Sequence, residues 1–370
     1  MEERNYWLGF SVFSGVGPLK FKKLLAEFGT AEKAWKAEIT DLKKVLGDKL
    51  TIKFDKFRNE FSIKDYLEKL KKKNAWFITS NDTSYPELLL EIPNPPFVLF
   101  GRGLRFEKFK DELKQTIGIV GSRKPTNYGK EVTQKFAEDL SLSGFTIVSG
   151  LALGIDGISH LSTLENGGKT IAVLGCGVDC CTPIHNKNIY DKIINGRGCV
   201  ISEVPLSYLP GKGLFPSRNR IIAGLSKAVL VTEGAEDSGS LITADFAFKF
   251  NRKVFAVPGP INSVLSKGPY KLINKGAKLV TSTEDILNEL KLQIPNYKSQ
   301  INPKTQTTKY KTESKEERLI LQALRNEELY FDEIARKTRI DSSKLGSILS
   351  MMEIKGIVKN VGNSTYSVKE

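Results

Sequence analysis

Cationic and amide side chains gather at one short segment of the sequence, where they could bind an anion. Phe215 is followed closely by Arg218, Asn219 and Arg220, and the apolar run 221–223 that comes next predicts a helix with a buried face. The N–H groups at a helix start carry partial positive charge, and guanidinium groups add strong donors for phosphate. An aromatic ring beside cations suits a phosphate that carries a base. The simpler alternative is a solvated helix start whose arginine side chains cover apolar surface.

Small residues with hydroxyl groups follow other apolar runs of the sequence. They are Gly121, Ser122 and Arg123 after one run, and Gly239, Ser240 and Thr243 after another. Glycine lets a backbone approach a ligand closely, and hydroxyl and guanidinium groups donate to phosphate oxygens. Lys212 adds a cation three residues before Phe215. Because ligands of parallel α/β sheets bind at the carboxyl ends of the strands, we expect these residues to converge on one sheet edge.

The sheet itself is predicted from residues 117–291, where β-branched apolar runs alternate with helical patterns. The runs lack polar alternation, as expected for strands that are covered on both faces. We therefore expect an α/β domain with a doubly wound, mostly parallel, extended Rossmann-like core. Its strands are predicted at 117–120, 146–149, 170–174, 199–202, 228–232, 254–257 and 278–280.

Four further segments flank this domain. Residues 1–72 predict a small helical domain of sterile-alpha-motif or helix–hairpin–helix type, because a glycine hairpin at 15–17 joins two helical patterns. Residues 73–116 are proline-rich and predict a connecting arm, with an edge strand at 97–100. Residues 292–312 predict a basic flexible linker, and residues 313–370 predict a winged-helix-like domain of three helices and a hairpin.

The charge of the chain favours a polyanionic partner. The net charge of +14 over 370 residues is carried by the first 312 residues, whereas residues 313–370 hold ten basic and ten acidic side chains. No apolar run is long enough to span a bilayer and the N-terminus lacks the layout of a signal peptide, so we expect a cytoplasmic protein without a membrane partner. The four cysteines lack metal-ligand spacing and are expected to be reduced structural thiols.

Two common enzyme classes are disfavoured by missing residues. The first predicted strand is not followed by G-x-G-x-x-G, the second does not end in an acidic residue for a ribose, and the sequence contains no Walker motif. His160 and His185 are the only histidines, and neither belongs to a recognisable serine–acid arrangement. Asp156 is interpreted as a charge in the first turn of a helix.

Several motifs in order resemble the DNA-processing protein A (DprA/Smf) family over about residues 85–285. They are Gly121-Ser122-Arg123, Tyr128-Gly129, the segment 149–156, the segment 215–226, the segment 238–244 and the segment 254–259. The two termini are similar to the helical N-terminal domain and the winged-helix-like C-terminal domain of that family.

The resemblance implies a DNA-binding protein without enzymatic activity or cofactor. Members of the family bind and protect incoming single-stranded DNA during natural transformation, help to load RecA recombinase, and form homodimers through the Rossmann-like domain. Carried over by motif, the strand-binding residues are Gly121, Ser122, Arg123, Lys212 and Phe215. We add Arg218, Asn219, Arg220, Gly239, Ser240 and Thr243 as further DNA-binding candidates.

Two alternative functions stay open at this point. Nucleoside-monophosphate phosphoribohydrolases of the lysine-decarboxylase-like fold use the same sheet, but their motif ends in a glutamate that is missing after Thr243 at the required spacing. A winged-helix transcription regulator would need a basic third helix, and this one offers Lys344 and Lys355 but few other cations.

Overall fold

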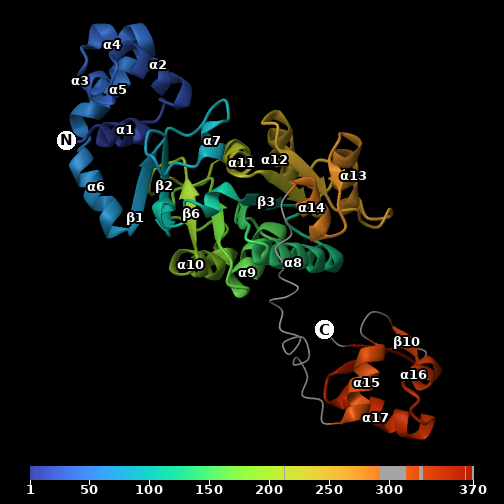
Figure 1. Cartoon of the computed structure of the whole chain (residues 1–370). Helices are drawn as coiled ribbons and strands as arrows, with labels where there is room; N and C mark the ends of the chain where they lie inside the picture. Colours follow the sequence, from blue (N-terminus) through green and yellow to red (C-terminus); the bar gives the residue numbers. More distant parts are fainter. Residues whose placement is uncertain (212, 292–313, 325–327, 363, 369–370) are drawn as a thin grey trace. The chain divides into compact units, whose positions relative to one another are not determined.

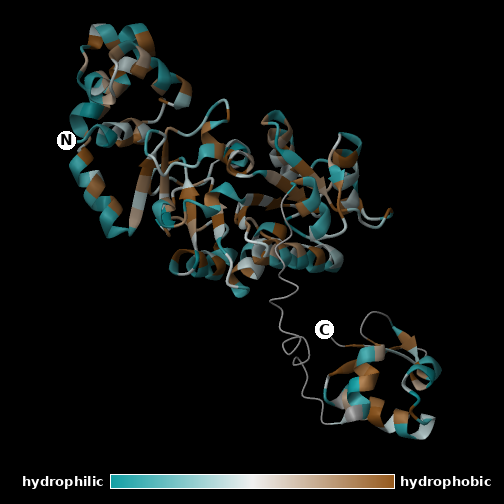
Figure 2. Cartoon of the chain, viewed as in Figure 1, coloured by the Kyte–Doolittle hydropathy of each residue, from teal (hydrophilic) through white to brown (hydrophobic). Residues whose placement is uncertain are grey.

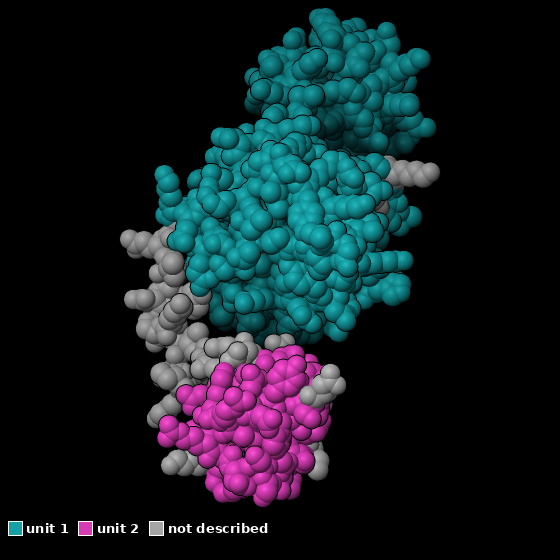
Figure 3. Space-filling model, turned by 90° about the vertical axis from the view of Figure 1, so that its right-hand side faces the viewer, with its two compact units in different colours: residues 1–295 teal, residues 296–370 magenta. Residues whose placement is uncertain are grey.

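The computed structural model describes residues 1–211, 213–291, 314–324, 328–362 and 364–368. Lys212 and the predicted linker 292–312 therefore lie outside the described residues. The chain divides into two compact units, residues 1–295 and residues 296–370 (Figure 3). The domain boundaries at residues 72, 116 and 291 remain predictions from the sequence.

Short helices form the N-terminal part of the first unit, as the sequence predicts. They are α1 Glu3–Val12, α2 Pro18–Phe28, α3 Ala31–Lys36, α4 Ile39–Leu46, α5 Asp48–Glu60 and α6 Ile63–Lys72. Gly29 ends α2 with a φ of 80°, and the Thr30 side chain caps α3 by accepting from the Lys33 N–H. The buried ring of Phe21 stacks on Phe97 with centroids 4.1 Å apart, so these helices share a core with the sheet region.

A nine-stranded sheet forms the centre of the first unit, in the order β1-β2-β6-β5-β4-β3-β7-β8-β9. The strands are β1 Ala75–Thr79, β2 Val98–Gly103, β3 Thr116–Val120, β4 Thr146–Ser149, β5 Thr170–Val173, β6 Gly198–Ser202, β7 Ala228–Val231, β8 Lys253–Ala256 and β9 Lys278–Leu279. From β6 to β9 all neighbours are parallel, which confirms the predicted mostly parallel Rossmann-like core.

One prediction about the sheet is wrong. The sequence predicts an edge strand at 97–100, but residues 98–100 belong to β2, which pairs antiparallel with both β1 and β6. The edge strand is β1, which is separated from α6 by two residues and pairs with β2 through Phe77 and Phe100. Pairing between strands this far apart in sequence leaves no local pattern to read.

Helices cover both faces of the sheet and place its apolar residues inside (Figures 1 and 2). Ile117 and Ile119 pack with α8 on one face, whereas Val120 and Val229 pack with α11 and α12 on the other. The remaining helices of this unit are α7 Glu87–Leu90, α8 Asn127–Leu142, α9 Ile155–Glu165, α10 Lys187–Asn195, α11 Leu214–Leu225, α12 Gly239–Lys249, α13 Lys267–Asn274 and α14 Thr283–Glu289.

The second unit is a winged helix, as predicted. Its elements follow one another as α15 Lys315–Ala323, β10 Leu329–Tyr330, α16 Phe331–Thr338, α17 Ser342–Ile354, β11 Val358–Gly362 and β12 Thr365–Val368. The three strands form one small sheet, and Ile320, Ile334 and Leu349 are buried between the helices. This order of helices and strands is the one found in winged helix-turn-helix modules.

Within the described ranges, no helix combines the length and the apolar composition needed to cross a bilayer. The four cysteines are free thiols. No cluster of three potential metal ligands occurs in the part of the chain that the structure covers.

Candidate nucleic-acid interface

The strand order reverses between β3 and β7, and a cavity of about 460 Å³ lies at the carboxyl ends of these two strands. Such switch points are where doubly wound sheets bind their ligands. The cavity brings together residues from five separate segments of the sequence, and its size is typical of a small-ligand pocket. The predicted site residues that line it are Gly121, Ser122, Arg123, Arg218, Asn219, Gly239, Ser240 and Thr243.

The turn after β3 approaches the neighbouring chain segments closely. The Ser122 N–H donates to Glu233 O at 2.7 Å, and Ser122 O accepts from the Ile155 N–H at 3.1 Å. A Cβ at Gly121 would lie 2.7 Å from Glu233 O, so only glycine fits at this position. The Ser122 hydroxyl oxygen accepts from the Lys124 N–H, which leaves its hydrogen available to a ligand.

Arg123 is the cation that this turn offers to a ligand. Its side chain is exposed, and no hydrogen bond or ion pair engages its guanidinium among the described residues. An exposed guanidinium at a sheet edge can bind a phosphate through two parallel N–H donors.

Glu233, at the end of β7, positions the segment that follows Arg123. Its buried carboxylate accepts from the Thr126 N–H at 2.9 Å and from the Thr126 hydroxyl at 2.6 Å. A Cβ at Gly129 would overlap this carboxylate, at 2.0 Å from Oε2. Glu233 therefore fixes the start of α8. The sequence analysis assigns Glu233 no role, although a carboxylate so close to the end of a buried strand indicates a partner inside the protein.

Arg218 lies inside the protein instead of at its surface. It is 8% exposed, and Nη1 donates to Val173 O and, at 2.6 Å, to Gly150 O. Its Nε donates to Asn219 Oδ1 at 2.9 Å. A Cβ at Gly150 would lie 2.3 Å from Arg218 Nη2, so the glycine after β4 makes room for the guanidinium. Arg218 thus joins α11 to the carboxyl ends of β4 and β5.

A buried carboxylate balances this buried cation. Asp156, in the first turn of α9 as predicted, accepts from the Gly150 N–H at 3.2 Å and the Ala152 N–H at 3.3 Å. Burial raises the pKa of Asp156, and the positive charge of Arg218 opposes that rise. The two charges therefore stabilise each other beneath the cavity.

His160 lies close to the same pair. Its Nδ1 is 2.6 Å from the Thr170 hydroxyl, which itself donates to Ile147 O, so Nδ1 must be the protonated nitrogen. Burial and the charge of Arg218 lower the pKa of His160 to about 3. The imidazole is therefore neutral at physiological pH and serves the structure.

Arg220 and Asn219 have internal partners as well. Arg220 Nη2 donates to both carboxylate oxygens of Glu203, at 2.6 and 2.7 Å, and Arg220 does not line the cavity. Asn219 Nδ2 donates to Gly239 O at 3.2 Å, which holds α11 against the start of α12. The pairings of Arg218 and Arg220 favour positioning roles over the phosphate contacts expected from the sequence.

The N-terminus of α12 forms another wall of the cavity. Gly239 and Ser240 begin this helix, and the Ser240 hydroxyl lies 2.8 Å from that of Ser238. Thr243 is buried one turn later. Phe215 belongs to the first turn of α11, directly before the segment that lines the cavity.

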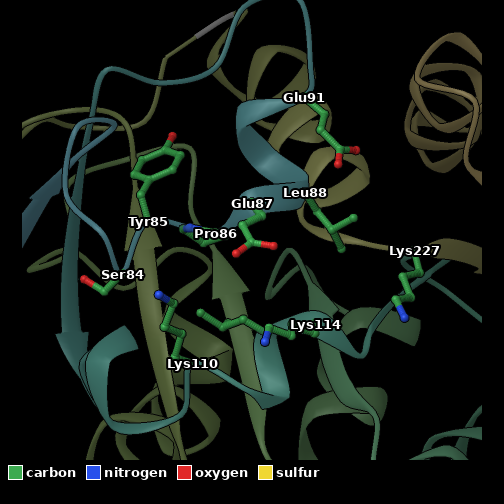
Figure 4. A pocket seen from close by; sticks show the side chains of 10 residues that line it. Ser84, Tyr85, Pro86, Glu87, Leu88, Glu91, Lys110, Lys114 and Lys227 are labelled. Carbon is green, nitrogen blue, oxygen red and sulfur yellow. The ribbon is translucent and has the colours of Figure 1, made fainter.

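A second, smaller cavity of about 170 Å³ lies at the opposite, amino ends of β3 and β7 (Figure 4). Lys110, Lys114 and Lys227 line it together with Glu87 and Glu91. Figure 4 shows the Glu87 carboxylate between the lysines, so this cavity presents both signs of charge. None of the predicted site residues lines it.

Comparison with known proteins places the chain in a family. Residues 76–291 match the family model for DNA recombination-mediator protein A, and residues 303–362 match that of the DprA winged helix domain. Protein Smf of Synechocystis is 38% identical over 98% of both chains. DNA processing protein DprA of Bacillus subtilis is 44% identical over 58% of this chain and 70% of its own length.

Solved structures agree with these matches. The crystal structure of DNA processing protein A from Streptococcus pneumoniae has a TM-score of 0.67 and 36% identity, over 77% of this chain and 97% of that one. DNA processing protein A of Helicobacter pylori, whose structure describes a single-stranded DNA binding mode, has a TM-score of 0.52 and 29% identity over 59% of this chain and 97% of its own. The chain therefore belongs to the DNA-processing protein A (DprA/Smf) family, because two domain models match in the expected order and a relative aligns along nearly its whole length.

Proposed function

We propose that this protein binds single-stranded DNA, without sequence preference, in the cavity at the carboxyl ends of β3 and β7. One observation carries the proposal: the exposed Arg123 guanidinium, the Ser122 hydroxyl and the start of α12 all face this single cavity. These are donors for a phosphate, and the cavity is large enough for a nucleotide beside them. The single-stranded DNA binding mode of the Helicobacter pylori relative supports the same ligand.

We further propose that Arg218 and Arg220 keep the cavity in shape, while Gly121, Ser122, Arg123, Lys212 and Phe215 contact the strand. Arg218 and Arg220 have protein partners for the donors described above. In this division the phosphate contacts belong to the turn after β3 and the base contact belongs to Phe215.

The finer role rests on membership of the family. We propose that the protein protects incoming DNA in the cytoplasm during natural transformation or related recombination, and helps to load RecA recombinase. We also propose that it acts as a homodimer through the Rossmann-like domain.

We propose that the site binds without catalysis. Cleavage of a glycosidic bond in a nucleoside monophosphate needs a carboxyl group near the scissile bond. The two buried acidic residues near the cavity already have internal partners, because Glu233 accepts from Thr126 and Asp156 accepts from two backbone N–H groups. Release of free base from AMP, lost on Ser240→Ala, would contradict this part of the proposal.

The test is a binding series with oligo-dT, duplex DNA and AMP at several salt concentrations. We expect oligo-dT to bind most tightly, and Arg123→Ala to weaken it and to flatten the salt dependence by about one charge. Phe215→Ala should weaken the free energy of oligo-dT binding by about 1–3 kcal/mol, with little change in its salt dependence. Lys130→Ala, an exposed lysine on α8, is the matched control. The proposal fails if both site variants fold and bind oligo-dT as the parent does.

A further inference from the structure

The loops that follow β3, β4, β5 and β6 form one connected edge of the sheet. The Ile155 N–H donates to Ser122 O at 3.1 Å, which joins the β4 loop to the β3 loop. Asn186 Nδ2 donates to Leu151 O at 3.0 Å, which joins the β5 loop to the β4 loop. The Gly177 N–H donates to Tyr208 O at 2.8 Å, which joins the β5 and β6 loops. The edge therefore runs without a break from the cavity to the far side of β6.

Large apolar side chains are exposed all along this edge. Leu153 is 39% exposed on the β4 loop and Ile184 is 68% exposed on the β5 loop. Tyr208 and Leu209 are 43% and 72% exposed on the β6 loop. We call these four residues the apolar edge. Exposed apolar side chains on loops that hydrogen bonds join into one support are typical of an interaction surface.

Positive charge lies at both ends of the apolar edge. Arg123 and Lys124 are exposed at the β3 end. At the β6 end, the Leu206 N–H donates to Tyr66 Oη at 2.9 Å, which attaches α6 to the β6 loop. Lys69 of α6 is exposed and lies over the Tyr66 ring, with Nζ 5.8 Å from the ring centroid, so it adds a cation beside the β6 loop.

The two acidic groups in these loops, Asp179 and Glu203, are already engaged, and the Glu203 carboxylate accepts from Arg220. Asp179 accepts from the Ser207 N–H at 2.7 Å and from the Ser207 hydroxyl at 3.1 Å. Its hydrogen bonds hold the β6 loop in place, and its charge faces Ser207 instead of an incoming ligand. The edge as a whole combines apolar platforms with cations at its ends, which is the pattern that suits single-stranded nucleic acid.

We propose that single-stranded DNA leaving the cavity continues along the apolar edge from β3 to β6. This proposal rests on the function proposed above. Bases pack on Leu153, Ile184, Tyr208 and Leu209, and the phosphates pass near Arg123 and Lys69. Three inter-strand spacings of about 4.8 Å give a path of about 14 Å, or about four nucleotides at the stacked rise of about 3.4 Å. The helical N-terminal region thereby becomes part of the DNA-binding surface.

Affinity for oligo-dT of increasing length tests this path. The double substitution Tyr208→Ala and Leu209→Ser should leave the affinity for dT2 unchanged, because dT2 fills only the cavity. The same protein should bind dT12 about five- to tenfold more weakly than the parent, since one aromatic platform and its neighbour are lost. Tyr208→Phe keeps the ring and should bind dT12 as the parent does. Leu90→Ser, on α7 and 43% exposed, is the matched control.

The outcomes separate the two proposals. If the parent binds no oligo-dT, or if Arg123→Ala and Phe215→Ala both bind it as the parent does, the proposed function itself fails. If Arg123→Ala weakens dT2 and dT12 while the folded double variant binds both as the parent does, the DNA does not follow the apolar edge. That second result would leave the edge to another occupant, such as a partner protein.

Discussion

Arg218 and Arg220 are two positions apart in α11, yet the structure gives them unlike surroundings. Arg218 is buried with Asp156 beneath the cavity, whereas Arg220 pairs with Glu203 at side-chain exposures of 14% and 25%. We expect Arg218→Met to lower the free energy of unfolding by about 3–5 kcal/mol, because it leaves a buried carboxylate without its cation. Arg220→Met should cost less than half as much. Urea unfolding of both variants measures the difference, and equal losses would contradict the assignment.

His160 provides a second test at the residue scale. Its pKa of about 3 in the folded chain lies below the unfolded value of about 6.5. Between these two values the unfolded chain binds the additional proton, so the stability contributed by neutral His160 falls as the pH falls from 6.5 toward 3. From pH 7 to pH 5 the parent should lose about 2 kcal/mol more than His160→Gln. Urea unfolding at the two pH values measures these losses of stability. Equal losses in the parent and in His160→Gln would count against a buried neutral imidazole.

At the scale of elements, Glu233 connects the end of β7 to the start of α8. Glu233→Ala removes both acceptors for Thr126, so we expect faster amide exchange at residues 124–130 and weaker oligo-dT binding, by about tenfold. Glu233→Gln keeps a carbonyl oxygen for the Thr126 N–H and should retain most of the affinity. Unchanged amide exchange in Glu233→Ala would show that the segment does not need this anchor.

Most of the elements could be read from the sequence, because their cause is local. The strands from β3 to β7 are buried on both faces, and their apolar β-branched runs, bounded by glycine, already show that. Whether Arg218 faces the protein or the solvent depends on Gly150, 68 residues earlier in the chain. The position of β2 inside the sheet likewise depends on its pairing with β1 and β6. Contacts between distant segments decide such details, and no local spacing records them.

At the scale of the whole molecule, the winged helix is expected to contact protein instead of DNA. In the third helix Lys344 pairs with Glu316, and Lys355 after it pairs with Glu317. Deleting residues 313–370 should therefore change the affinity for oligo-dT by less than about threefold, or ~0.7 kcal/mol. Deleting residues 292–370 should weaken oligo-dT binding further, because the linker 292–312 contains four lysines and no acidic residue. A tenfold loss from the shorter deletion would assign DNA contacts to the winged helix.

The two outer strands of the large sheet decide how readily further chains can pair with it at high concentration. β9 has only two residues, and one of them is Lys278. At the other margin, Arg4 of α1 donates to Phe77 O of β1 at 3.2 Å and its guanidinium lies over the Phe77 ring. An exposed margin of unpaired backbone is a template on which further chains can add strand by strand. The β9 margin is only two residues long and carries a lysine, and the β1 margin is partly occupied by Arg4. Both offer little such template, so fibrous aggregation by sheet extension is disfavoured even in crowded solution.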